Sequence, residues 1–510
     1  MKYKNLVLIF IVAIILPLSA CSFPYVNEQV NSGSLPTHVP EIVAVDPTPT
    51  LVPIPLDLTI QQNDFLTPTP DPPHITPSYL TETIYYTVQS GDTLGTIAEK
   101  FDVTISFIAN SNSIYSWNWI AVGQELVLPA PDSGDISPDF KIIPDSELVN
   151  GPRSINLDCN AIAERYDGYL TQYAEMVDGK LRTGPEIIEY VAALYSVNPR
   201  LLLAVLEYQS GWLTKGNSGI DQVQYPAGNI DPWRVGLYYQ MSWTANTLNN
   251  GYYLWKEGLI AGVTTQDNIF IPASPTVNAG TFAVQHLFSK LYDQEDWIDV
   301  VTKTGFFATY EELFGYPFAW AFEPLIPSDL EQPPLQLPFE EGVIWNFTGG
   351  PHNGWDSGSA WAALDFSPPM YYSGCYTSYD WVVAVADGFI THSEMGAVIQ
   401  EIDGDGYPEI GWTILYMHIA QDGRVEVGQY VKAGERIGHP SCEGGISTGT
   451  HLHIARRYNG EWILADGDVP FVMDGWKPVG TGVMYNGYLQ NNGTIVEACE
   501  CLDPISTIQK

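Results

Sequence analysis

Three patterns of apolar and polar positions follow one another along the chain. Over residues 85–128, short apolar alternations flank two stretches in which apolar residues recur every three or four positions. From 150 to 335 the helical period prevails, and from 338 to 470 alternating apolar positions are separated by glycine-rich turns. We therefore predict a multidomain protein with a small α+β unit, a mainly α middle domain and a C-terminal antiparallel β domain.

The first residues are typical of an export signal. Lys2 and Lys4 precede an apolar run over 6–18, too short for an ordinary membrane-spanning helix, so residues 1–21 are predicted to be a signal peptide. The run ends in Leu-Ser-Ala-Cys, which resembles the lipobox of bacterial lipoproteins. The resemblance implies a lipid anchor on Cys21 that holds the chain to the membrane, outside the cytoplasm. The alternatives are a simple signal peptide or an uncleaved anchor.

Residues 22–82 are rich in proline, threonine, aspartate and valine and have no sustained periodicity. Such a segment cannot bury enough apolar surface to fold alone, so we predict an extended linker. About 60 residues at roughly 3.1 Å each could span about 150–190 Å, which suits a thick cell wall.

The composition limits the classes of function. With 510 residues, 45% of them hydrophobic, the chain can form several packed cores. It has 21 lysines and arginines against 59 aspartates and glutamates, so its formal charge is −38 at pH 7. Such a surface repels phosphate backbones, and we expect no nucleic acid partner.

The unit over 83–131 carries a specific motif. Its start has the form Y-x-V-x-x-G-D-T-L-x-x-I-A and its end the form V-G-Q-x-L-x-L-P. We expect a helix capped by Ser90 or Asp92, a second helix near 104–109 and a closing strand over 125–128. The whole unit resembles a LysM domain. The resemblance implies binding to glycans that contain N-acetylglucosamine, such as peptidoglycan.

The middle domain is predicted over 150–335. Its apolar residues show helical spacing over 159–176, 184–195 and 199–208. The phrase VAALYSVNPRLLLAVLEYQSGWLT within it is similar to the lysozyme-like fold of lytic transglycosylases. We expect this domain to hold glycan or to be structural.

The catalytic glutamate of that resemblance is missing. The transglycosylase phrase has the form LLLAI-x-x-ESG, and this chain places Gln209 at the position of the glutamate. An amide cannot act as a general acid, so we predict an inactive domain. Glu207 lies two residues earlier, about 200° around the helix, which makes it a poor substitute. An active glycosidase is the alternative.

Six of the nine histidines fall in the C-terminal domain, predicted over 338–470. A catalytic zinc site uses three protein ligands and leaves a fourth position open. The chain has no H-E-x-x-H sequence, which excludes the common helical zinc-protease arrangement. Instead, His451 and His453 stand two apart in Thr-His-Leu-His-Ile and would share one face of a strand, while Leu452 enters the core.

The order of candidate residues resembles the lysostaphin and LytM class of zinc endopeptidases, whose motifs are a His…Asp pair, a Y-x-H strand end and an H-x-H strand. The phrases VAVADGFI, VKAGERIG and ISTGTHLHI also match that class. The resemblance implies zinc bound by His352, Asp365 and His453. It also implies that His418 and His451 stand beside the metal and act on the water, the oxyanion and the leaving amine.

The spacing of the first two ligands departs from the commoner pattern. His352 and Asp365 are thirteen residues apart, whereas many members have H-x-G-x-D. The longer gap resembles the β-lytic branch of the class. Asp356 is a nearer carboxylate and fits the short pattern, but Asp365 has the apolar strand setting that the ligand of the class occupies. His392 and His439 lie outside the motifs and are expected to be structural.

One further pattern is a weaker indication of metal binding. Asp403-Gly-Asp-Gly is a candidate calcium loop, but the ligand pattern is incomplete and a hairpin tip is favoured.

The cysteines of an exported chain are candidates for disulfides. Five follow Cys21, so at least one has no partner within the chain. We predict a bond between Cys375 and Cys442. Cys499 and Cys501 are too close together for an easy mutual bond, which leaves Cys159 as a possible partner for one of them.

The leading hypothesis is a membrane-anchored zinc endopeptidase that hydrolyses amide bonds in peptidoglycan. The LysM domain would hold the glycan while the domain over 338–470 cleaves the peptide, and residues 471–510 would be a C-terminal extension. The alternatives are a non-catalytic wall-binding or regulatory lipoprotein, and a glycosidase active in the middle domain. The sequence indicates neither an oligomeric state nor which bond is cleaved.

Overall fold

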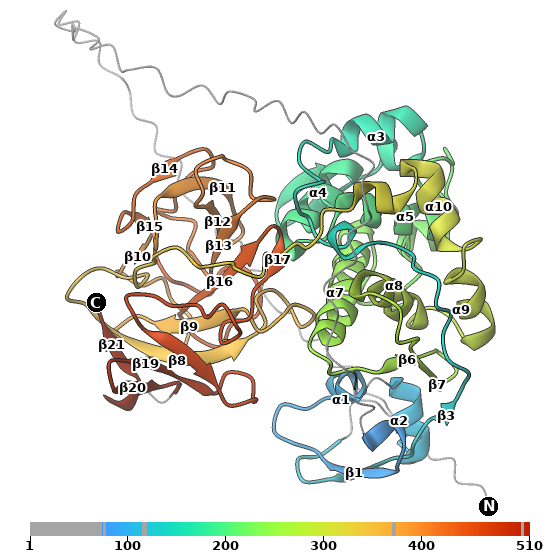
Figure 1. The fold of residues 1–510 in the computed structure, drawn as a ribbon, viewed down its shortest axis with the longest axis horizontal. Coiled ribbons are helices and arrows are strands. Elements are labelled where there is room, and N and C mark those ends of the chain that lie inside the picture. The colour runs from blue at the N-terminus through green and yellow to red at the C-terminus, as the bar shows by residue number, and fades with distance from the viewer. Residues whose placement is uncertain (1–73, 75–77, 102, 115–119, 370–373, 501–503) are drawn as a thin grey trace, which may run out of the picture. The chain divides into compact units, whose positions relative to one another are not determined.

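The computed structural model describes residue 74 and residues 78–101, 103–114, 120–369, 374–500 and 504–510 (Figure 1). The predicted signal peptide and lipobox, and nearly all of the predicted linker, lie outside these residues. Within the described part of the chain, no helix has both the length and the apolar character that crossing a membrane requires.

The small N-terminal unit has the predicted order of strand, two helices and strand. Strand β1 (Ile84–Thr87) pairs antiparallel with β2 (Glu125–Leu128), and the helices are α1 (Leu94–Lys100) and α2 (Ile105–Ser111). Thr104 caps α2 by accepting the amide of Phe107. Both helices bury apolar residues against the strand pair, which makes this the first core of the chain.

The predicted cap of α1 is wrong. The amide of Thr96 donates to the Thr93 hydroxyl, 3.1 Å away, so Thr93 occupies the capping position. The carboxylate of Asp92 instead accepts the amide of Gln89 and the hydroxyl of Tyr86, each at 2.7 Å. Asp92 therefore closes the turn before the helix.

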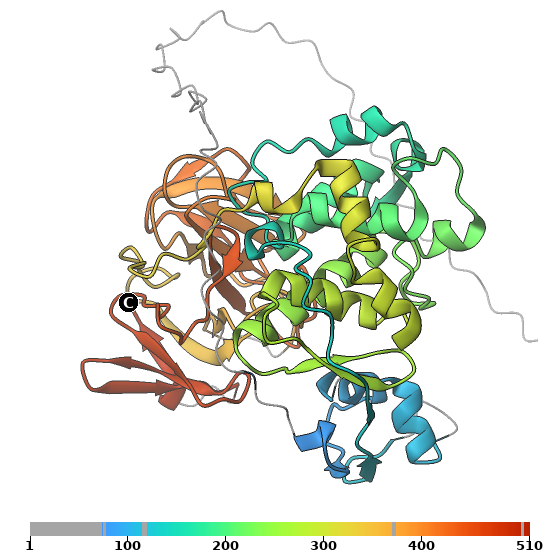
Figure 2. The same ribbon diagram turned by 45° about the vertical axis from the view of Figure 1, so that its right-hand side comes forward.

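The middle domain is mainly helical, as predicted. Its helices are α3 (Cys159–Tyr166), α4 (Gly184–Tyr195), α5 (Pro199–Ser210), α6 (Ile220–Gln224), α7 (Leu237–Lys256), α8 (Ala279–Ser289), α9 (Gln294–Val300) and α10 (Phe306–Phe314). Helices α7 and α8 lie side by side in both views (Figures 1 and 2). Short strands β3 (Asp132–Ser133), β6 (Gly262–Thr264) and β7 (Ile269–Pro272) form a separate small sheet.

The helix predicted over 159–176 is too long. Helix α3 ends at Tyr166 because Asp167 adopts a left-handed conformation, with φ of +51°. Residues 174–177 form strand β4 (Ala174–Val177), which pairs with β5 (Lys180–Thr183). The side chain of Met176 is exposed and that of Val177 is buried, which is the alternation of a strand.

The core of the middle domain surrounds α5, whose residues 201–206 are all buried. At its start the Arg200 guanidinium forms a buried ion pair with Glu147, whose carboxylate also accepts from Asn198 and Tyr310. A buried charge needs such partners to offset its desolvation.

The C-terminal domain contains an antiparallel sheet, as predicted, and this sheet has nine strands among the described residues. Its strands pair in the order β14 (Tyr430–Val431), β11 (Gly388–Glu394), β12 (Ala397–Glu401), β13 (Trp412–Met417), β16 (Leu452–Tyr458), β9 (Ala363–Ser367), β8 (Ile344–His352) and β21 (Thr507–Gln509), with β17 (Glu461–Trp462) beside β16. Strands β10 (Val382–Val383) and β15 (Arg436–Gly438) form a separate pair.

The segment predicted as a C-terminal extension is structured. Strands β18 (Lys477–Gly480), β19 (Gly487–Asn491) and β20 (Thr494–Glu497) form a three-stranded sheet. Strand β21 then pairs with β8, the strand that ends at His352. The chain after 470 is therefore part of the architecture that supports the site.

The segment with Asp403 is a hairpin connection between β12 and β13. The buried Glu401 carboxylate accepts the amides of Asp403, Gly404 and Gly406, and Asp403 accepts the amide of Trp412. These carboxylates bind amides of their own turn, which confirms the predicted hairpin tip.

The predicted disulfide between Cys375 and Cys442 is confirmed. The predicted pairing of Cys159 is wrong, because its thiol is free and buried in the core of the middle domain. Burial raises the pKa of this thiol well above its usual value, and the nearby carboxylate of Glu189 adds to the shift. Cys499 is disulfide-bonded.

Replacing Cys375 and Cys442 together by serine should lower the midpoint of thermal unfolding of the C-terminal domain. The bond closes a separation of 67 residues. Chain entropy assigns about 4 kcal/mol to a loop of that length. Scanning calorimetry of the double variant should show the lower unfolding midpoint, whereas Cys159→Ala should change the midpoint much less. Equal midpoints for the wild type and the double variant would contradict the prediction.

Candidate metal centre and active site

Three neighbouring strands bring the candidate metal ligands together. His352 ends β8, Asp365 lies in β9 and His453 lies in β16, and these strands are adjacent in the sheet. Asp365 is the cross-strand partner of His453 on one side and of Gly349 on the other. Strand register therefore joins residues that are about a hundred positions apart in the sequence.

Gly349 makes room for the carboxylate. A Cβ atom at this position would lie 2.7 Å from Asp365 Oδ2, closer than a nonbonded carbon and oxygen can approach. Any larger residue at 349 would therefore push Asp365 away from the histidines.

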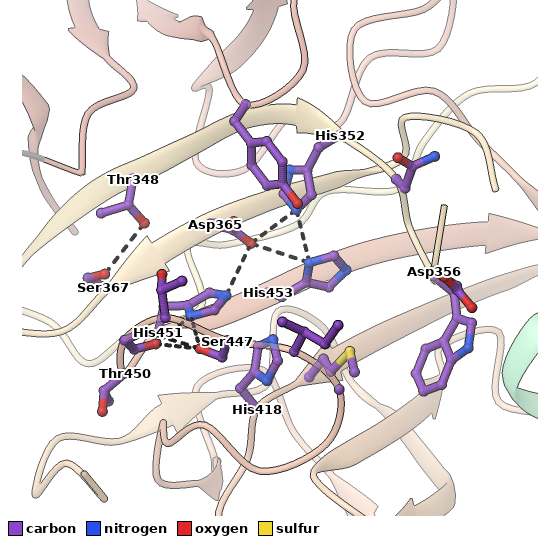
Figure 3. Close-up of a pocket in the computed structure, with 18 of the residues that line it drawn as sticks. Thr348, His352, Asp356, Asp365, Ser367, His418, Ser447, Thr450, His451 and His453 are labelled. Atoms are coloured by element: carbon purple, nitrogen blue, oxygen red, sulfur yellow. Dashed lines mark hydrogen bonds and ion pairs between the residues drawn. The ribbon is translucent and has the colours of Figure 1, made fainter. Parts of the chain in front are cut away.

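The three side chains converge on one point (Figure 3). The Nε2 of His352 lies 3.2 Å from Asp365 Oδ1 and 3.0 Å from His453 Nδ1, and His453 Nδ1 lies 3.3 Å from Asp365 Oδ1. All three residues are buried. Among the residues that the structure describes, they are the group of histidine, cysteine and carboxylate side chains placed to hold a metal ion.

In His352 and His453, the ring nitrogen that points away from the cluster determines which nitrogen faces it. His352 Nδ1 is 2.8 Å from the carbonyl of Gly350, and His453 Nε2 is 3.0 Å from the carbonyl of Gly354. Because a carbonyl only accepts, each of these ring nitrogens must carry the proton. The inward nitrogens of the neutral rings then present lone pairs toward each other and toward the carboxylate. Three buried acceptors without a donor between them fit a cation.

The charge state of Asp365 supports the same conclusion. Burial alone would raise the pKa of its carboxyl, but positive charge on His352 and hydrogen bonds from His352 and His453 would hold that pKa well below its usual value, and a cation at the same point would act in the same direction. Its Oδ1 is buried and has no hydrogen-bond donor of good geometry among the described residues. An ionised, unsatisfied oxygen aimed at two imidazoles is a metal-ligand arrangement.

His418 and His451 lie beside this cluster. Their ring centroids are 4.4 Å apart, and His451 Nε2 is 3.8 Å from Asp365 Oδ1. His418 Nδ1 is 3.1 Å from the carbonyl of Glu443, and His451 Nδ1 is 2.8 Å from that of Gly449. Both rings therefore keep Nε2 as the basic nitrogen.

The surroundings keep His418 neutral. Burial lowers the pKa of its imidazole to about 3, and the neighbouring His451 and His453 contribute to the shift. The neutral ring keeps a lone pair on Nε2, which can accept a hydrogen bond from a water molecule in the site.

All five residues line one cavity of about 890 Å³. Its other lining residues include Tyr485 from the segment after 470, and Tyr195 and Tyr238 from the middle domain. The structure therefore places every residue predicted for the site in one pocket. Their chemical roles stay predictions.

Comparison with known proteins identifies three domains in the chain. Residues 376–464 match the model of peptidase family M23, residues 86–129 match the LysM domain, and residues 141–327 match the N-terminal domain of LasA. The sheet domain is an M23 peptidase domain. The M23 match contains His418, His451 and His453 but begins after Asp365. The candidate metal cluster therefore draws two of its three side chains, His352 and Asp365, from strands outside the matched range.

Two curated relatives match different shares of the chain. Protease LasA of Pseudomonas aeruginosa (strain UCBPP-PA14) is 27% identical over 326 residues, which cover 60% of this chain and 73% of that protein. A beta-lytic metalloendopeptidase of Lysobacter enzymogenes is 29% identical over 174 residues, covering 31% of this chain and 89% of the relative. Among solved structures, the M23 metalloprotease pseudoalterin is 25% identical and covers 33% of this chain and 96% of that chain, with a TM-score of 0.28.

The alternative ligand Asp356 lies elsewhere in the M23 domain. Its carboxylate accepts the hydroxyl of Tyr195 at 3.1 Å and the amide of Ser357 at 2.7 Å. It lines the cavity but is not in the metal-holding group. Of the two histidines outside the motifs, the His439 ring lies 3.7 Å from that of Trp381 and is tilted by 40° to it, and the His392 ring lies 5.9 Å from that of Tyr190.

Tyr485 is a site residue that the sequence did not indicate. Its ring stacks on His352 with centroids 4.3 Å apart, and its carbonyl accepts the amide of Gly350. Burial raises the pKa of its hydroxyl, and Asp365 and Glu500 raise it further, so the group stays a proton donor. No motif surrounds Tyr485, and only the return of the chain to β8 brings it to the site.

The two middle-domain residues considered for a catalytic role, Glu207 and Gln209, both accept hydrogen bonds from neighbouring groups. Glu207 accepts the amides of Leu213 and Thr214 and the hydroxyl of Thr214, so it fixes the turn after α5. Gln209 accepts the hydroxyl of Tyr292 at 3.0 Å. The helical content of this domain is confirmed, whereas its lysozyme-like character stays a prediction.

Proposed function

We propose that the protein is a zinc endopeptidase of the cell envelope that hydrolyses amide bonds in peptidoglycan, with its LysM domain binding the glycan. The observation that carries the proposal is the convergence of His352 Nε2, Asp365 Oδ1 and His453 Nδ1, with His418 and His451 beside them. Two imidazoles and one carboxylate are a common catalytic donor set for zinc.

His352, Asp365 and His453 would hold the zinc ion, and the carboxylate would offset part of its charge. When bound, zinc acidifies a coordinated water and polarises a carbonyl. His418 and His451, beside the cluster, would take a proton from the attacking water through Nε2 and return it to the leaving amine. The protonated hydroxyl of Tyr485 can donate to the oxygen that becomes negative during the attack.

The substrate follows from the domain combination. The M23 domain supports peptide-bond hydrolysis, and the names of the relatives, Protease LasA and beta-lytic metalloendopeptidase, agree with it. The LysM domain supports binding of a glycan. A polymer that joins both chemistries is peptidoglycan, which also agrees with the predicted export signal and lipid anchor at Cys21.

The middle domain is proposed to be a non-catalytic, lysozyme-like unit. Gln209 cannot donate a carboxyl proton, and the Glu207 carboxylate is committed to the backbone of the next turn. A purely regulatory protein is disfavoured because all five residues of the site are present and converge.

The test is metal analysis and muropeptide mapping with the chain that lacks residues 1–21. We expect about one zinc per chain and new amino termini in digested peptidoglycan, both lost in His453→Ala. New reducing ends without new amino termini would transfer the activity to the middle domain. Absence of both zinc and released ends would refute the proposal.

A further inference from the structure

The loop between the first two candidate ligands connects the metal cluster to the middle domain. It comprises residues 353–362 and accounts for the long spacing between His352 and Asp365. Near its start, the carbonyl of Gly354 lies 3.0 Å from His453 Nε2. The position of this carbonyl therefore sets the orientation of the His453 ring, and with it the direction of Nδ1.

The loop has its own internal bonds. The side chain of Asn353 donates to the carbonyls of Ser357 and Ser359, and the amide of Trp355 donates to the Ser359 hydroxyl at 2.8 Å. The amide of Gly354 donates to the carbonyl of Ala360 at 2.9 Å. The loop is thus one compact unit, so a displacement of its tip would be transmitted to Gly354.

The tip of the loop is held by two helices of the middle domain. Tyr195, the last residue of α4, donates its hydroxyl to Asp356 at 3.1 Å. In α7, the Asn246 side chain accepts the amide of Gly358 at 2.7 Å and donates to the Ser357 hydroxyl at 3.0 Å. Both helices therefore contact the loop within four residues of Gly354.

The fit against α7 is close. A Cβ atom on Gly358 would lie 2.0 Å from the backbone carbonyl oxygen of Asn246, so only glycine allows this approach. The Tyr195 side chain is 7% exposed, and burial raises the pKa of its hydroxyl, which keeps the proton that it donates to Asp356. The Tyr195 ring also packs edge-on against Trp355.

We propose that Tyr195 and Asn246 are positioning residues of the metal site: they hold the inter-ligand loop so that the Gly354 carbonyl orients His453. The inference rests on the proposed function, because it assigns the middle domain a part in zinc binding. It also gives the unusual spacing of His352 and Asp365 a role, since a four-residue spacing would leave no loop for the helices to hold.

The test compares Tyr195→Phe and Asn246→Ala with matched variants in α7. Tyr239→Phe changes a tyrosine that is 56% exposed, and Asn250→Ala changes a half-buried asparagine four residues further along α7 than Asn246. Zinc affinity is measured by chelator competition, and hydrogen exchange of the amides in 353–362 by mass spectrometry. We expect roughly ten-fold weaker zinc binding and faster exchange in the first pair, with both controls unchanged.

A double-variant cycle separates positioning from general packing. Asp356→Ala should weaken zinc binding as much as Tyr195→Phe does. The double variant should bind zinc no more weakly than either single variant. Asp356→Asn, which keeps an acceptor oxygen, should stay close to the wild type. Unfolding midpoints are recorded for each variant. If Asn246→Ala lowers the midpoint strongly, Asn246→Ser replaces it in the zinc-binding and exchange measurements.

Two outcomes distinguish this inference from the proposed function. If Tyr195→Phe and Asn246→Ala bind zinc and exchange loop amides like the wild type while Asp365→Asn is inactive, the positioning role is wrong and the peptidase proposal stands. If Asp365→Asn binds zinc and cleaves like the wild type, the peptidase proposal itself has failed.

Discussion

Replacement of Asp365 by asparagine should remove zinc binding and lower peptidoglycan cleavage by roughly 10³-fold or more. The carboxylate supplies the only negative charge in the described metal-holding group, and it faces both histidines at 3.2 and 3.3 Å. Asparagine has almost the same shape, so the sheet should keep its packing while the site loses that charge. The measurements are zinc content by mass spectrometry and the rate at which new amino termini appear.

Asp356→Asn is the control for this experiment, because Asp356 is the carboxylate that fits the shorter sequence pattern. Its two carboxylate oxygens accept separately from Tyr195 and Ser357; the asparagine Oδ1 can still accept the amide of Ser357, while its Nδ2 can donate to the Tyr195 hydroxyl. We expect full zinc content and a loss of less than about ten-fold in rate. A variant pair in which Asp356→Asn loses zinc and Asp365→Asn keeps it would reverse the ligand assignment.

Replacement of His418 or His451 by alanine should leave zinc bound and lower the turnover number by about 10²–10⁴-fold, the contribution of general acid–base catalysis. Both rings bind backbone carbonyls through Nδ1 and keep a basic Nε2 near the cluster. Neither is in the group of side chains that converge to hold the ion. The measurement is the turnover number at saturating substrate together with zinc content.

His439→Ala is the matched control, since that histidine lies outside the cavity lining and its Nδ1 donates to the carbonyl of Asp380 at 2.8 Å. It should leave both zinc content and turnover near the wild-type values. If His418→Ala and His451→Ala lost zinc together with activity, these residues would be ligands, and the division of roles between them and His453 would be wrong.

The sequence alone indicated most of the local structure. Helical and alternating periods predicted the α+β, α and antiparallel β parts, because burial of one face imposes a period on any helix or strand. The prediction failed where local signals compete. Residues 159–176 have apolar residues at helical spacing, yet the chain breaks at Asp167 and continues as a strand pair.

The sequence also determined which residue types are available for the site and in which order. His352, Asp365, His418, His451 and His453 could be selected because their chemistry and motifs are visible in the chain. The choice of Asp365 over Asp356 rested on the apolar neighbours of a buried strand, and Asp365 is indeed in β9.

Only the tertiary structure decided how these residues meet. The adjacency of β8, β9 and β16, the space left by Gly349, and the carbonyls that turn each imidazole inward are contacts between distant segments. The stacking of Tyr485 on His352 and the hydrogen bond from Tyr195 to Asp356 are also contacts between distant segments. Periodicity reports how each element is buried, whereas strand order and register determine which side chains face one another, and no local pattern encodes those.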